Sequence, residues 1–299
     1  MLDSILSIAF LVQSLRITIP YALPALGATF SERSGVVNIA LEGILLISAF
    51  ATTVATFYSD SPLLGILCGI GAGLLTALLH SVISVGFKAN QIVSGIAINL
   101  FAVGITKFAC QVIFHSSSNS DRIVGMEVYA NWAGIPFLNY PFITATVFLL
   151  LLSNFVLFKT RFGLRLRAVG EHPEAAETLG INVQTVRHAA VLISGALTGI
   201  GGAWLALDQH SFTDGMSAGR GFIALAAMIV GKWKPLGAVA ACLFFGIAEN
   251  IANQVQGGNI PSQFIQMLPY VLTMIVLAGF IGRSIPPAAD GIPYEKEQH

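Results

Sequence analysis

One charged segment interrupts the apolar sequence of this chain: KTRFGLRLRAVGEHPEAAETLGINVQTVR, residues 159–187. The runs on both sides of it are almost free of charge and long enough to cross a membrane as helices. A third of the chain's 15 lysines and arginines lie in this segment: Lys159, Arg161, Arg165, Arg167 and Arg187. Because so much charge cannot lie in hydrocarbon, and cationic loops stay on the cytoplasmic side, we expect the segment to project into the cytoplasm.

The centre of this segment, EHPEAAETLG at 171–180, predicts a short helix. Pro173 suits the first turn of a helix, Ala175 and Ala176 are strong helix formers, and Gly180 is typical of a helix end. A short, mixed-charge helix between two membrane spans is either an ordinary solvated loop or a docking element for a soluble partner. The residues alone do not decide between these two interpretations.

The composition indicates an integral membrane protein. Of the 299 residues, 55% are hydrophobic and only 10% are charged, and the mean hydropathy is +0.78, whereas soluble proteins have about 25% charged residues. The apolar runs suit membrane-spanning helices and lack the alternation of an outer-membrane barrel. The formal net charge is zero, which gives no indication of a nucleic-acid partner. We therefore expect an all-α, multi-pass fold in which residues 1–299 form one transmembrane domain.

Nine apolar segments are candidate spans, consistent with about 8–10 transmembrane helices including discontinuous ones. The first contains Arg16, Pro20 and Pro24, the seventh is short, and the tail 283–299 is expected to be a solvated end. The candidate segments are 4–30, 36–57, 62–86, 92–114, 140–158, 188–207, 217–231, 236–253 and 263–282.

Charge counting gives the expected orientation. If 159–187 is cytoplasmic and the spans alternate, the C-terminus and most other cations are cytoplasmic too, and only Arg122 and Arg220 fall outside. The first ten residues, MLDSILSIAF, contain Asp3 but no lysine or arginine, which argues against a cleaved signal peptide.

Sequence motifs for catalysis or metal binding are absent from this chain. Cys68, Cys110 and Cys242 are isolated in apolar segments, where we expect them to be buried small side chains, and the histidines form no HExxH pattern. A phosphate-binding GxxxxGK[ST] loop is also absent. We therefore expect no catalytic residue and no metal site, and no ATP hydrolysis by this chain itself.

Four groups of polar residues interrupt the apolar pattern: 31–43 (SERSGVVNIALEG), 88–107, 219–237 and 249–254. Polar side chains and irregular backbone at membrane depth are tolerated where they line a water-filled cavity or are buried in protein. The first and third interruptions occupy corresponding places in the two halves of the chain, which is a pointer to a transport pathway. Candidates for its lining are Asn38, Glu42, Gln91 and Asn99; the alternative is that they hydrogen-bond between helices.

Glycines recur every four residues in two apolar segments. Gly65, Gly69 and Gly73 form one series, and Gly195 and Gly199 form another. In a bilayer this spacing lets helix backbones approach closely, so we expect both series at helix–helix contacts.

Four runs of sequence resemble the permease subunits of bacterial ATP-binding-cassette (ABC) importers, in the family that includes ribose, branched-chain amino-acid and nucleoside permeases. The similarity covers essentially the whole chain, and the form of the first run resembles the nucleoside or simple-sugar branch. The four runs are SERSGVVNIALEG (31–43), NQIVSGIAINLFAVGIT (90–106), LRAVGEHPEAAETLGI (166–181) and GRGFIALAAMIVGKWKPLGA (219–238).

The resemblance implies a fold like that of type II ABC importer permeases, in the bacterial inner membrane. It implies a second permease subunit, identical or different, a cytoplasmic ABC ATPase that binds ATP and Mg²⁺, and an extracytoplasmic substrate-binding protein. This chain is expected to bind no cofactor and to contact membrane lipid. The region 171–180 matches the family's coupling segment, whose expected ATPase-contacting residues here are Glu171, His172, Pro173, Glu174, Ala175, Ala176, Leu179 and Gly180.

The expected function is nucleoside import by ATP-driven alternating access, with a simple sugar as the alternative cargo. A secondary carrier is the main alternative of another class. It would need an ion-binding or titrating site in the spans, and Glu42 and Glu249 are the candidates for such a site.

Overall fold

The computed structural model describes residues 7–126, 140–255, 271 and 285–295. Within these ranges the regular elements are helices, apart from one isolated bridge between Asn119 and Thr213. Seven described helices are long and apolar enough to span a membrane. They are α2 (Ile8–Arg33), α3 (Leu41–Ser59), α4 (Pro62–Ser81) continued by η1 (Val82–Gly86), α5 (Gln91–Phe114), α6 (Pro141–Lys159), α9 (Val183–Gln209) and α11 (Pro235–Val255).

The expectation of an all-α, multi-pass fold is thus confirmed, and the predicted spans match these helices closely. The short seventh segment is α10 (Arg220–Val230). The first span continues to Arg33 instead of ending at residue 30. The predicted span 263–282 lies outside the described residues, apart from residue 271.

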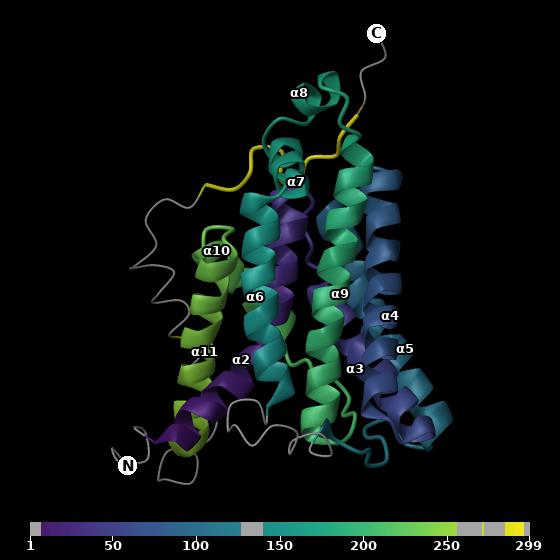
Figure 1. Cartoon of the computed structure of the whole chain (residues 1–299). Coiled ribbons are helices and arrows are strands. Elements are labelled where there is room, and N and C mark those ends of the chain that lie inside the picture. The colour runs from purple at the N-terminus through teal and green to yellow at the C-terminus, as the bar shows by residue number, and fades with distance from the viewer. Residues whose placement is uncertain (1–6, 127–139, 256–270, 272–284, 296–299) are drawn as a thin grey trace.

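The charged segment lies at one end of the bundle (Figure 1). It forms α7 (Arg161–Glu171) and α8 (Pro173–Thr178), and the C-terminal segment 285–295 runs beside them, while the start of α2 and the loop after α5 lie at the opposite end. Arg33 and Lys88 also lie at the α8 end, where Arg33 adjoins α7 and Lys88 pairs with Glu295. The positive-inside rule therefore assigns this end to the cytoplasm.

The prolines of α2 bend this helix, and the bend is visible in Figure 1. Pro20 has no N–H, so the carbonyl of Arg16 loses its usual helical partner. The indole Nε1 of Trp204 in α9 donates to this carbonyl at 3.2 Å. A backbone group that the bilayer could not satisfy is thereby paired inside the protein.

The glycine series bring α4 and α9 into backbone contact, as predicted. A Cβ on Gly73 would lie 2.5 Å from the carbonyl oxygen of Gly195, and a Cβ on Gly199 would lie 2.9 Å from that of Gly69. Only glycine permits this spacing, so α9 packs at the centre of the bundle against α4. The prediction for the cysteines is confirmed at Cys110 and Cys242, which are buried, and is wrong for Cys68, which is exposed on α4 because its side chain points away from the bundle.

Candidate coupling and transport sites

The short helix predicted at 171–180 is present as α8. Pro173 occupies its first turn, and Gly180 ends it with a positive φ of 79°. The N–H of Ile181 donates to the carbonyl of Ala176 at 3.1 Å and that of Gly180 to Glu177 at 2.8 Å, which closes the C-terminus of the helix. The result is a compact projection with fixed ends beyond the membrane-spanning helices.

The residues expected to contact an ATPase are not equally accessible. Ala176 is buried against Val169 of α7 and Val183 of α9, so it attaches α8 to the bundle instead of facing a partner. Leu179 is 82% exposed, so its whole side chain is accessible to a partner. Pro173 is half-buried, and the other expected contact residues are exposed: Glu171, His172, Glu174, Ala175 and Gly180.

The helix α7 connects α8 to the membrane-spanning helices by close packing. Its residues Leu166 and Val169 are fully buried. A Cβ on Gly163 of the same helix would lie 2.2 Å from the carbonyl oxygen of Val156 in α6. A Cβ on Gly170 would lie 2.1 Å from the carbonyl oxygen of Arg33 at the end of α2. Because these contacts bring backbone against backbone without free space, we expect α7 and the adjoining ends of α2 and α6 to move together.

Residues 285–295 of the expected solvated tail, which we call the C-terminal segment, are mostly exposed, but the segment is anchored at several points. Its Ala289 is buried and donates its N–H to the carbonyl of Gly170 in α7 at 2.9 Å. Tyr294 donates its hydroxyl to Glu177 of α8. The prolines and charges of this segment are typical of an unstructured tail. Its backbone hydrogen bonds, which sequence composition does not reveal, hold it against α7.

Arg187 of α9 joins the C-terminal segment to the membrane-spanning part. Its guanidinium is buried, with Nη1 donating to the carbonyl of Ile292 at 2.9 Å and Nε donating to that of Ser34 at 3.1 Å. Ser34 opens the non-helical connection 34–40 between α2 and α3. One side chain thus connects α9, the C-terminal segment and this connection.

Asp290 gives the C-terminal segment a pH dependence. Burial raises the pKa of its carboxyl from 3.8 to about 7, and the positive charge of Arg187 opposes this shift without cancelling it. The folded state therefore holds the proton more tightly than the unfolded state does. The stabilisation from a protonated Asp290 is present below about pH 4 and is lost as the pH rises through about 7.

Asp290→Asn is expected to remove the contribution of this carboxyl to the pH dependence, while the carboxyl of Glu32, to which Asp290 hydrogen-bonds, stays in place. Asparagine carries no charge to desolvate, so the variant should be more stable than the wild type near pH 7.5, by an amount of the order of a few kcal/mol. Thermal unfolding of the purified protein in detergent between pH 4 and 8 measures the effect. A constant difference between the two proteins across this range would contradict the assignment.

The buried connection 34–40 is held by polar side chains from three helices. Gln91 of α5 accepts from the N–H of Val37 at 2.7 Å, and His80 of α4 contacts the carbonyl of the same residue at 3.1 Å. Asn99 donates to the carbonyl of Ile39 at 3.0 Å and accepts from the N–H of Gly43 at 2.8 Å. Irregular backbone at membrane depth requires such partners.

The four candidates for the pathway lining therefore direct polar atoms to the protein itself. Asn38 lies in this connection, not in a helix as expected from its apolar neighbours, and donates to Ser194 of α9 at 3.0 Å. Gln91 and Asn99 bond the backbone, as described. The structure thus brings Asn38, Gln91 and Asn99 together around the buried connection 34–40. This arrangement corresponds to the alternative in which these residues hydrogen-bond between helices.

The first and third polar interruptions meet in space at two levels. Glu42 in the first turn of α3 accepts from the N–H groups of Gly219 and Gly221 at 2.8 and 2.7 Å, and so caps the start of α10. At the cytoplasmic end, Trp233 donates its indole N–H to buried Glu32 at 2.6 Å. Arg33 donates to the carbonyl of Trp233 at 2.9 Å.

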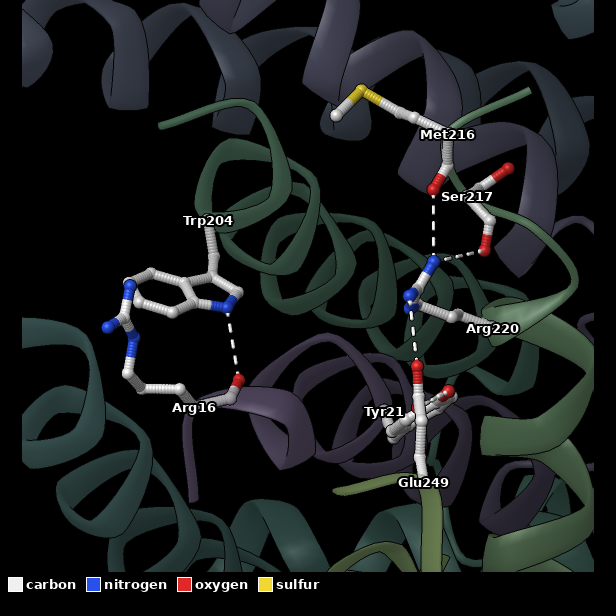
Figure 2. Close-up of polar contacts among 7 residues, drawn as sticks. All are labelled: Arg16, Tyr21, Trp204, Met216, Ser217, Arg220 and Glu249. Atoms are coloured by element: carbon white, nitrogen blue, oxygen red, sulfur yellow. Dashed lines mark hydrogen bonds and ion pairs between the residues drawn. The ribbon is translucent and has the colours of Figure 1, made fainter. Parts of the chain in front are cut away.

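Arg220, which charge counting places on the outer side, lies beside the middle of α2 instead of at an end of the bundle. Its guanidinium pairs with Glu249 of α11 at 3.3 Å and lies 5.8 Å from the ring centroid of Tyr21 in α2 (Figure 2). Charge counting assumes that each apolar segment crosses the membrane completely. The helix α10 has only 11 residues, and the side chain of its first residue contacts Tyr21 in the middle of α2.

Comparison with known proteins identifies the family. The family model described as branched-chain amino acid transport system / permease component matches residues 10–277. The chain belongs to this permease family. This permease is 44% identical to the nucleoside ABC transporter permease protein NupC of Lactococcus lactis subsp. cremoris (strain MG1363), over 93% of this chain and 94% of that protein. It is 42% identical to the guanosine ABC transporter permease protein NupQ of Bacillus subtilis (strain 168), over 96% and 98%.

A solved structure of an ABC transporter in an inward-facing conformation has the same fold. The TM-score is 0.50 at 21% sequence identity, over 90% of this permease and 84% of that chain. The agreement in helix arrangement accords with the multi-pass architecture of the described residues.

Proposed function

We propose that this permease is a pore-forming subunit of an ABC importer and that α8 docks on a cytoplasmic ATPase. The observation that carries the docking role is the exposed Leu179 at the tip of a closed, rigid helix beyond the membrane-spanning part. A leucine in this position gains by burial in a partner's groove. The acidic residues Glu171 and Glu174 beside it offer charge complementarity to a basic groove rim.

The coupling mechanism is a rigid-body displacement. The ATPase binds ATP and Mg²⁺, and its closure moves α8, which carries α7, the ends of α2 and α6, and α9 with it. The permease catalyses no covalent step. Because these elements are closely packed, a shift at α8 changes the packing between the subunits that form the pathway.

Nucleosides are the proposed cargo, in a bacterial inner membrane, with delivery by an extracytoplasmic binding protein and with a second permease subunit completing the pore. The support for this cargo is the 42–44% identity to NupC and NupQ over nearly the whole chain. A neutral, polar solute also suits a bundle in which charges at depth are paired.

Uptake by the reconstituted importer tests this function. Proteoliposomes that contain both permease subunits and the ATPase, with binding protein outside, should accumulate radiolabelled guanosine only when ATP is supplied to the ATPase. Parallel assays use ribose and leucine. Accumulation of ribose but not guanosine would make the sugar the cargo. Accumulation without ATP, driven by an ion gradient, would overturn the importer mechanism in favour of a secondary carrier.

A further inference from the structure

An ion pair at the midplane of the bundle has no part in the coupling route. Glu249 of α11 accepts from Arg220 of α10 at 3.3 Å and from the hydroxyl of Tyr21 (Figure 2). Tyr21 lies 13 residues after Ile8 and 12 before Arg33, which places it at the middle of α2. The pair is therefore about as far as it can be from both ends of the bundle.

The described residues do not fully enclose the ion pair. The side chains of Arg220 and Glu249 are 19% and 21% exposed, and Nε of Arg220 has no hydrogen-bond partner among the described residues. Charged groups at this depth face a water-filled cavity or another protein, because contact with lipid tails is unfavourable. The exposed atoms of the pair therefore need water, another subunit or residues beyond the described ranges as partners.

The backbone that precedes Arg220 is also partly exposed. Residues 210–219 are not helical, and Gly215 and Ala218 are exposed. A Cβ added to Gly215 or Gly219 would meet no atom within 4 Å. Because residues 210–214 bond the loop after α5 at the outer end of the bundle, this backbone leads from that end to Arg220.

Two side chains complete the arrangement. Glu42 caps the backbone on both sides of Arg220 and so fixes where the guanidinium lies. Phe222, two residues later on another face of α10, is half-exposed. Cation, carboxylate and hydroxyl thus meet at the start of a discontinuous helix, the kind of place where transport proteins bind their solutes.

We propose that Arg220, Glu249 and Tyr21, with the open face of residues 215–222, form a midplane contact site for the transported solute. Its ligand class is a neutral molecule with several hydroxyl and amide groups, such as a nucleoside. The carboxylate of Glu249 accepts from hydroxyl groups, and the guanidinium of Arg220 donates to carbonyl oxygens or ring nitrogens. Because the ion pair has no net charge, it binds a neutral solute only weakly and allows the solute to leave. This proposal rests on the transport function proposed above.

Thiol labelling tests whether the open face lines water, independently of any cargo. In a variant whose three natural cysteines are replaced by serine or alanine, Ala218→Cys is compared with Leu100→Cys, an exposed position on the continuous helix α5. Both variants are assembled with the second permease and the ATPase. A charged, membrane-impermeant thiol reagent should modify Ala218→Cys at least about 10-fold faster, because the thiolate forms only where water is present. Equal rates, or protection of Ala218→Cys by the second permease alone, would overturn the proposal.

Transport by Glu249→Gln and Tyr21→Phe tests the contact with solute. Each variant removes one charge or one hydroxyl and keeps the side-chain shape. Guanosine uptake per ATP hydrolysed should fall about 10-fold in Glu249→Gln and less in Tyr21→Phe, while the ATPase rate stimulated by loaded binding protein stays unchanged. Glu295→Gln, at an exposed carboxylate on the cytoplasmic side, is the control. Wild-type coupling ratios in both variants would show that the cluster is not a solute site. Absence of uptake in the wild type would instead refute the proposed function.

Discussion

Leu179→Asp is expected to separate the permease from its ATPase while leaving it folded in the membrane. The side chain is 82% exposed, so the free permease loses almost no packing. If Leu179 fills a groove on the ATPase, the variant loses that burial and places a carboxylate in an apolar site. The combined effect is about 3 kcal/mol, or roughly 100-fold in affinity. Co-purification of the ATPase and ATP-driven uptake measure the two consequences.

Leu164→Asp is the matched control for this prediction. Leu164 is also an exposed leucine at the cytoplasmic end, but it lies on α7 outside the α8 projection. It should retain the ATPase. Equal loss of the ATPase in both variants would mean that general hydrophobicity of this end, and not the tip of α8, makes the contact. Retention of the ATPase and full uptake by Leu179→Asp would show that α8 is a solvated loop.

Deletion of residues 285–299 is expected to give a different failure, in which the ATPase stays bound but its cycle no longer drives uptake. Among the hydrogen bonds that the deletion removes are those from Ala289 to Gly170, from Ala288 to Glu171, from Arg187 to Ile292 and from Tyr294 to Glu177. At about 1 kcal/mol each, their loss frees α8 and the connection 34–40 to move separately. Uptake per ATP hydrolysed should then fall by at least about 10-fold, because several kcal/mol of coupling is lost.

Smaller changes distinguish this failure from misfolding. Tyr294→Phe removes only the hydroxyl that bonds Glu177 and should reduce coupling in part. Glu295→Gln breaks only the exposed pair with Lys88 and should have little effect, since surface ion pairs contribute little. Full coupling in the deletion variant would mean that the C-terminal segment is a passive cover over α7.

Local chemistry made α8 and the membrane spans predictable. Pro173 and Gly180 define the two ends of α8 by backbone geometry that needs no tertiary information. The glycine series likewise predicted close helix contacts, because spacing along a helix determines which glycines share a face. The family resemblance added the role of coupling segment, which residue types alone left open.

Long-range pairing explains what could not be predicted. The partner of Glu42 is the backbone of Gly219, 177 residues away, and the partner of Arg187 is Ile292, 105 residues away. Composition could show that Asn38 and Asn99 need hydrogen-bond partners, but not that those partners are other parts of the same chain. The depth of Arg220 depends on a helix that stops halfway, which a count of apolar segments treats as a full crossing.

The cap that Glu42 places on α10 has a consequence for how the protein is made. With 11 residues, α10 is too short to cross a bilayer, so it cannot remain there as an independent segment. Its first N–H groups find their acceptor on α3, which leaves the ribosome long before. We therefore expect α10 to take up its position only once α3 is in the membrane.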